Sequence, residues 1–234
     1  MKMTLMQHFS ELKRRILWTM FMFVLAFGLG WVVAPDVEAF LAAPLINVWH
    51  DAALLYTGLS DGLMIQFSLA TLVAMIITIP FFMWQTWAYV APGLHKNEKQ
   101  FLLPIFLLSP ILFLIGAGFA FYVLFPIVFK FFIDLNESGT VPVVLFPAIR
   151  GYLGFAIDLL KIFGIAFQLP LILVILNRAG LLSKQTAQKS RKYVIVLIFV
   201  MAAVLTPPDI VSQVLLAVPM WLLFEISLLF MHRD

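Results

Sequence analysis

The sequence predicts an all-α integral membrane protein. Of its 234 residues, 63% are hydrophobic and only 12% are charged, and the mean hydropathy is +1.05. An ordinary soluble domain carries about a quarter charged residues and about half apolar ones. A soluble globule of this length could not bury so much apolar surface, so the composition excludes a water-soluble enzyme.

Six apolar stretches lie between charged residues, and each is a candidate membrane span. A spanning helix needs about 20 apolar residues, because each residue rises about 1.5 Å across a hydrocarbon core of roughly 30 Å. The stretches are Ile16–Pro35, the segment between Asp61 and Lys96, the segment between Lys99 and Lys130, Tyr152–Asn177, Tyr193–Pro208 and Ile210–Met231. We predict six transmembrane helices in a single domain over residues 1–234.

The positions of lysine and arginine predict the orientation of these spans. With the N-terminus inside, 12 of the 15 cationic residues are cytoplasmic, Lys130 and Arg150 lie outside, and Lys161 lies within a span. Both termini are therefore predicted to be cytoplasmic. The first apolar run exceeds the usual signal-peptide core of about 7–15 residues, so we expect it to be retained as a span.

The last two predicted spans are short. The helix from Tyr193 to Thr206 has 14 residues, about 21 Å, which is less than the hydrocarbon thickness. The chain then turns at Pro207, Pro208 and Asp209. Either this hairpin is shielded or thins the bilayer, or the true boundaries lie a few residues away.

Prolines recur in the spans, at Pro80, Pro104, Pro110, Pro126, Pro170 and Pro219. Each removes a backbone donor and tends to kink its helix, although membrane helices often tolerate single prolines. As a set they predict a concave bundle, with either a shaped receptor surface or a transport cavity.

Few polar side chains fall inside the spans, and such groups are functional candidates because burial in the bilayer is costly. Asp158 and Lys161 are three residues apart, so we expect them to pair near the outer surface. Gln168 lies deeper and needs a partner, either another helix or a guest peptide. Glu225 is protonated, paired or near the cytoplasmic interface, and the sequence alone does not distinguish these alternatives.

Sequence signatures of catalysis are absent. There is no HExxH, Walker A or GxSxG motif, and no pair of intramembrane aspartates. The histidines, His8, His50, His95 and His232, lack metal-ligand spacing, and there are no cysteines. The formal charge of +3 comes without a basic arm, which disfavours nucleic-acid binding. We therefore predict neither an enzyme nor a bound cofactor or metal.

The chain resembles the TatC family, the receptor core of the twin-arginine protein translocase, through ordered motifs along nearly its whole length. They are His8-x-x-Glu11-Leu12-x-x-Arg15, Ala43-Pro44-Leu45, Pro80, the stretch from Gln85 and Trp87 through Ala91-Pro92 to Leu94 and Glu98, Phe163-Gly164, Phe167-x-x-Pro170, Arg191-Lys192-Tyr193, Thr206-Pro207-Pro208-Asp209-x-x-Ser212-Gln213, and Pro219 with Phe224-Glu225-Ile226.

The resemblance implies a receptor that binds twin-arginine signal peptides of folded proteins at its cytoplasmic face. It implies partner subunits of the TatA/TatB type, possible self-association, transport driven by the proton-motive force, and location in a bacterial inner membrane or an organelle membrane of bacterial descent. The implied signal-binding residues are Glu11, Glu98, Lys13, Arg14, Tyr89 and Pro92. The implied structural or partner contacts are Pro44, Pro80, Gln168, Pro170, Pro207, Pro208, Asp209, Gln213 and Glu225.

Two other functions are compatible with the physical pattern. A small secondary transporter would have kinked helices around a midplane site, but it should also show an inverted repeat and convergent polar groups, and no repeat is evident. A membrane scaffold without a transport role would leave Glu11 and Glu98 freely replaceable. Gln168 stands where many relatives of the family carry Glu, and it cannot titrate, so no proton-coupling role is assigned to it.

Overall fold

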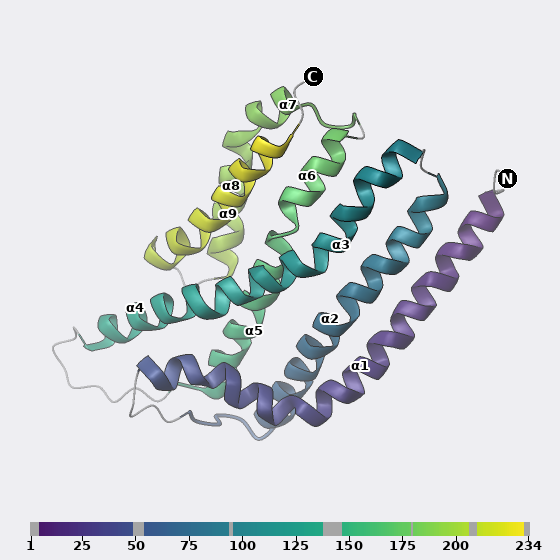
Figure 1. Ribbon diagram of the computed structural model, residues 1–234. Helices are drawn as coiled ribbons and strands as arrows, with labels where there is room; N and C mark the ends of the chain where they lie inside the picture. The colour runs from purple at the N-terminus through teal and green to yellow at the C-terminus, as the bar shows by residue number, and fades with distance from the viewer. Residues whose placement is uncertain are drawn as a thin grey trace. The chain divides into compact units, whose positions relative to one another are not determined.

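The computed structural model describes residues 5–48, 54–93, 96–137, 147–178, 180–205 and 210–231. Within them the chain is almost wholly helical, which confirms the all-α prediction (Figure 1). The helices are α1 (Leu5–Val48), α2 (Asp61–Val90), the 3₁₀ turn η1 (Ala91–Gly93), α3 (Lys96–Phe119), the π-helix η2 (Ala120–Leu124), α4 (Phe125–Glu137), α5 (Ile149–Ala166), α6 (Leu169–Arg178), α7 (Lys184–Lys189), α8 (Arg191–Leu205) and α9 (Ile210–Phe230).

Five helical segments of the described chain are long and apolar enough to cross a membrane. They are Phe9–Asn47, Asp61–Val90, Leu102–Asp134, Ile149–Arg178 and Gln213–Phe230. The predicted fifth span corresponds to α8, whose 15 residues make it shorter than any of these five segments. The chain is therefore a multi-pass membrane protein with five full-length candidate spans and one shorter apolar helix.

The predicted end of the first span is wrong. Helix α1 continues through Pro35 to Val48, so Pro44, expected in an outer loop, is a buried helical residue. A proline removes only one backbone donor, and a helix can continue when its neighbours are satisfied. The sequence analysis placed the end of the span at Pro35, before the acidic residues Asp36 and Glu38, but the helix continues through all three residues.

Two prolines mark departures from regular α-helix. The π-helical turn η2 precedes Pro126, and the Phe125 N–H donates to the Ala120 carbonyl across this turn. Helix α5 ends at Ala166 and α6 begins at Leu169, directly before Pro170, so the stretch predicted as one span is interrupted at one of the prolines expected to kink a helix. The missing proline N–H gives both irregularities a physical cause. Helices α2, α3 and α9 continue through their prolines, Pro80, Pro104, Pro110 and Pro219.

The described chain divides into two compact units. The first comprises residues 1–38 and 63–111, and in it α2 lies between α1 and α3 (Figure 1). Ala26, Gly30 and Ala34 recur every four residues on α1, and a Cβ atom at Gly30 would lie 2.6 Å from the Ala70 carbonyl oxygen of α2. Small residues therefore let the two backbones approach closely, as membrane helices commonly require.

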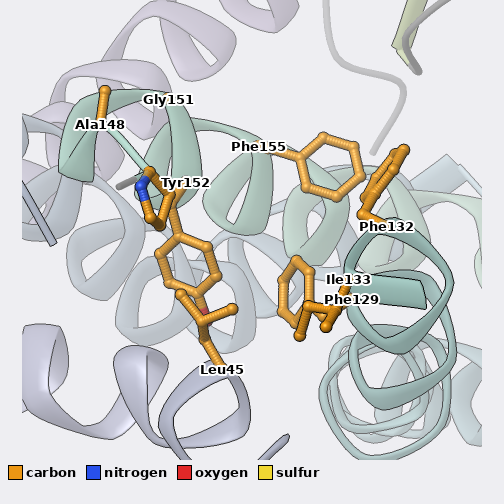
Figure 2. Close-up of a pocket in the computed structure, with 9 residues that line it drawn as sticks. Leu45, Phe129, Phe132, Ile133, Ala148, Gly151, Tyr152 and Phe155 are labelled. Atoms are coloured by element: carbon orange, nitrogen blue, oxygen red, sulfur yellow. The ribbon is translucent and has the colours of Figure 1, made fainter. Parts of the chain in front are cut away.

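The second unit comprises residues 39–62 and 112–234, and aromatic side chains join its α1 segment to η2 and α5. Phe40 stacks on Phe121 with ring centroids 4.3 Å apart, and the Tyr152 hydroxyl donates to the Leu41 carbonyl at 2.7 Å. Tyr152 and Phe129 also line an apolar cavity of about 320 Å³ (Figure 2). Its walls come from α1, α4, α5 and the residues just before α5, and aromatic side chains supply much of this packing.

The C-terminal part of the second unit is built on α9, which packs against α6 and α8. Helix α7, which the sequence analysis missed, begins with the Ser183 hydroxyl accepting a hydrogen bond from the Thr186 N–H at 3.1 Å. Its Ala187 is buried with Phe224 and Leu228 of α9. A capping serine before a short polar segment was the sequence signal for this helix.

Substitution of Gly116 by alanine should destabilise the protein by about 1–3 kcal/mol, because overpacking a close contact forces the backbone to shift. A Cβ atom there would lie 2.4 Å from the Phe163 carbonyl oxygen. Gly118→Ala is the matched control in the same helix, where a new Cβ meets nothing within 4 Å. Unfolding in detergent should show a loss for the first variant and no loss for the second; equal effects would contradict the packing described.

Candidate functional site

The most constrained charged group on the predicted cytoplasmic face is Glu11, on the second turn of α1. Its Oε1 accepts hydrogen bonds from Arg15 Nε at 3.1 Å and Arg15 Nη2 at 2.5 Å. The Glu11 side chain is 13% exposed and the Arg15 side chain is 17% exposed. The spacing of four residues places them on one helix face, and burial on this scale strengthens their attraction relative to an exposed pair.

Arg15 also joins α1 to the last turns of α2. Its Nη1 donates to Gln85 Oε1 at 2.9 Å and to the Gln85 carbonyl at 3.4 Å, and Nη2 donates to the Ala88 carbonyl at 3.1 Å. The carbonyl groups at a helix C-terminus lack intrahelical partners and carry the negative end of the helix dipole. One guanidinium therefore fixes the position of Glu11 relative to the end of α2.

An apolar groove lies beside this ion pair, between α1 and α2. It has a volume of about 360 Å³ and is lined by Leu12, Arg15, Ile16, Thr19, Met20, Phe82, Gln85, Thr86 and Tyr89. Tyr89 is the one predicted signal-binding residue that lines it. Lys13 and Arg14 are exposed on α1, and Pro92 is exposed in η1.

The second predicted acidic residue, Glu98, lies in the first turn of α3. Its side chain lies outside what the structure describes. Residues 91–95 connect its helix to α2, so Glu98 and the end of α2 belong to the same compact unit. A joint site formed by Glu11 and Glu98 stays a prediction.

The predicted structural contacts fall into three groups. Gln213 on α9 donates from Nε2 to the Phe199 carbonyl of α8 at 2.9 Å, and Glu225 accepts from Arg191 Nη2 at 2.8 Å. Of the alternatives for Glu225, pairing is the one observed. Pro170 is buried and Pro80 lies on the surface, whereas Pro207, Pro208 and Asp209 fall outside the described residues.

Gln168 occupies the break between α5 and α6, where it is half-buried. Its N–H donates to the Ile165 carbonyl at 2.9 Å, and its carbonyl accepts from the Ile172 N–H at 3.0 Å. The backbone at the break is therefore satisfied across the proline. The predicted pair of Asp158 and Lys161 is confirmed, with Nζ and Oδ1 3.0 Å apart.

Sequence reasoning missed the parts played by Arg15 and Gln85. The Glu11–Arg15 spacing of four residues was a readable signal for an ion pair. The contact with Gln85, 70 residues away, had no sequence signal. Among the described residues no group of three or more His, Cys, Asp or Glu side chains could hold a metal ion.

The chain matches the model of a family described as Sec-independent protein translocase protein (TatC) over residues 7–219. It is 38% identical to the Sec-independent protein translocase protein TatC of Azotobacter chroococcum, covering 99% of this chain and 90% of that protein. Identity to the TatC protein of Escherichia coli K12 is 34%, over 97% and 87% of the two chains. A crystal structure described as the twin arginine translocase receptor TatC matches with a TM-score of 0.85 and 32% identity, over 95% and 97% of the two chains.

The Glu225→Gln substitution should lower the free energy of unfolding by no more than about 1 kcal/mol, because the pair with Arg191 is partly exposed. The double variant Arg191→Gln/Glu225→Gln should cost little more than either single variant, since each change removes the same contact. Chemical unfolding of the wild type, the two single variants and the double variant gives the coupling free energy between the two side chains. Additive losses would show that the two charges act independently.

Proposed function

The chain belongs to the TatC family of Sec-independent protein translocase proteins, and we propose that its cytoplasmic face binds the paired arginines of signal peptides. Family membership makes it a component of the twin-arginine translocase and not an enzyme, as the sequence predicts. The secondary-transporter alternative has no support among the matches. The observation that best supports the proposed site is the position of the Glu11 carboxylate. Arg15 binds it on α1 and also binds the last turns of α2.

Two carboxylates, Glu11 and Glu98, are suited to two guanidinium groups. A guanidinium presents a planar fork of donors that a carboxylate can accept bidentately, which an ammonium group cannot copy. Each charge-assisted hydrogen bond contributes about 1.5–3 kcal/mol. A Lys-Lys signal should therefore bind more weakly than an Arg-Arg signal. Lys13 and Arg14 would then contact carbonyl or acidic groups of the peptide.

The groove between α1 and α2 provides a place for apolar residues that follow the arginines. Its walls are mainly hydrocarbon and aromatic, from Leu12, Ile16, Met20, Phe82 and Tyr89. It adjoins the Arg15–Gln85 contact directly, so a peptide with its arginines near Glu11 can place a neighbouring apolar side chain in it. Burial of that side chain would contribute about 1.5–3 kcal/mol.

We further propose six membrane passages with both termini in the cytoplasm, α8 being the sixth span. Its 15 residues are apolar and it packs on α9. Its short length requires local thinning of the bilayer or cover by neighbouring protein. The whole chain, residues 1–234, would act as one domain despite its two compact units.

The partners are proposed to be single-span subunits of the TatA/TatB type, folded cargo bearing twin-arginine signals, and further copies of this chain. Helices α8 and α9 are suited to hold a partner helix, because Gln213 and the Arg191–Glu225 pair fix them to one another. Transport would draw on the proton-motive force. Location in a bacterial inner membrane fits the bacterial sources of the similar proteins.

Replacing Glu98 by alanine should weaken Arg-Arg signal-peptide binding by at least about tenfold, because a charge-assisted hydrogen bond is lost. The variant should stay folded and inserted. Photo-crosslinking of a labelled signal peptide to the purified protein measures the loss. Asp134→Ala, which removes an exposed carboxylate on α4, is the matched control and should crosslink normally. Undiminished crosslinking of the Glu98 variant would refute the assignment.

The Gln168→Glu substitution should be tolerated, because glutamate keeps the length and the acceptor oxygen of glutamine at a position that is only half-buried. Gln168→Leu removes the polar group and should impair export more. Export of a twin-arginine reporter protein by cells that depend on each variant measures this order. A severe defect for glutamate would show that the surroundings of this residue exclude an ionisable group.

A further inference from the structure

The carboxylate proposed to receive a signal arginine already holds an arginine of its own chain. Both Arg15 Nε and Arg15 Nη2 donate to Glu11 Oε1, and Glu11 is only 13% exposed. The other carboxylate oxygen, Oε2, is buried. A guanidinium from a signal peptide would therefore have to compete with Arg15 for this carboxylate. The unliganded site is therefore occupied by an internal group of the same chemistry as its proposed ligand.

Arg15 has other acceptors that do not depend on Glu11. The Gln85 amide oxygen, 2.9 Å from Nη1, and the carbonyl oxygens of Gln85 and Ala88 all accept from its guanidinium. They lie in the last turns of α2, where the helix dipole favours a cation. If Arg15 released Glu11, its guanidinium would stay bound to α2 and part of its charge would still be compensated there. This lowers the free-energy cost of an exchange.

We propose that Arg15 is an internal competitor for Glu11, and that signal binding replaces its guanidinium with one from the peptide while Arg15 stays on α2. The inference rests on the proposed function, since it assigns Glu11 to the peptide. The exchange moves no proton and breaks no covalent bond. One charge-assisted contact is made as another is lost.

Competition from Arg15 lowers the apparent affinity of the protein for signal peptides. Only molecules in which Arg15 has released Glu11 can bind a peptide, so the apparent affinity is the intrinsic affinity multiplied by the fraction of such molecules. An incoming arginine can restore the hydrogen bonds that Glu11 loses, whereas a lysine presents a point charge without the planar fork. Weakly matching peptides therefore gain too little to displace Arg15.

The Arg15→Lys variant tests this directly, because lysine keeps the charge and loses the fork. With the full chain in nanodiscs, the association rate constant of an Arg-Arg signal peptide should rise about threefold or more, as the binding-competent fraction increases. The dissociation rate constant should hardly change. A Lys-Lys peptide should gain by a similar factor, since both peptides meet the same competitor.

A second variant should shift the rate in the opposite direction. Gln85→Leu keeps the bulk of the side chain but removes the amide acceptor that holds Arg15 on α2. Arg15 should then hold Glu11 more firmly, and association should slow by about threefold or more with dissociation again unchanged. Arg150→Lys makes the same change in another Arg–carboxylate pair, the one with Asp61, and should alter neither rate constant.

The outcomes separate the exchange from the proposed function. If Glu11→Gln abolishes binding but Arg15→Lys speeds dissociation or slows association, the receptor site stands and Arg15 positions Glu11 instead of competing for it. If Glu11→Gln binds Arg-Arg peptide normally, the assignment of Glu11 fails, and the exchange is overturned with it. Opposite shifts in association for Arg15→Lys and Gln85→Leu support the competitor.

Discussion

The structure depends on one constraint, which is that no water is present in the bilayer core to satisfy a polar group. A helix meets this constraint for the backbone, and charged side chains meet it by pairing near helix ends. Each described ion pair joins residues of one helix or of two different elements: Glu11–Arg15, Asp61–Arg150, Asp158–Lys161 and Glu225–Arg191. The role proposed for Glu11 extends the same rule to a partner from another protein.

Departures from regular helix are confined to places where the chain has local compensation. At the start of α2, Asp61 accepts from the Thr57 and Gly58 N–H groups at 3.1 and 2.6 Å, which orders the loop before the helix. Leu55 adds a short parallel bridge to Ala148, with hydrogen bonds to Pro147 and Ile149. These contacts satisfy loop backbone that would otherwise be unpaired, and so they hold the segment before α2 against the start of α5.

Composition and long apolar stretches were sufficient to predict the fold class and most helices, since hydrophobicity over about 20 residues is a strong local signal. The family was predicted from the ordered motifs that the chain shares with it. Local rules failed where a proline could be tolerated, as at Pro35 and Pro44. They also failed for α7, a short polar helix whose stability comes from packing on α9. Glu11 was predictable from its motif. The contact of Arg15 with Gln85 was not predictable, because it depends on how α1 packs against α2.

The most direct test of the receptor assignment is the binding of a labelled signal peptide to the purified protein in nanodiscs. Arg-Arg and Lys-Lys versions are compared on the wild-type chain and on the double variant Glu11→Ala/Glu98→Ala, with and without a TatB-type partner. We predict preferential binding of the Arg-Arg peptide by the wild-type chain and loss of that preference in the double variant. Equal binding of both peptides with the partner present, or an unchanged preference in the double variant, would contradict it.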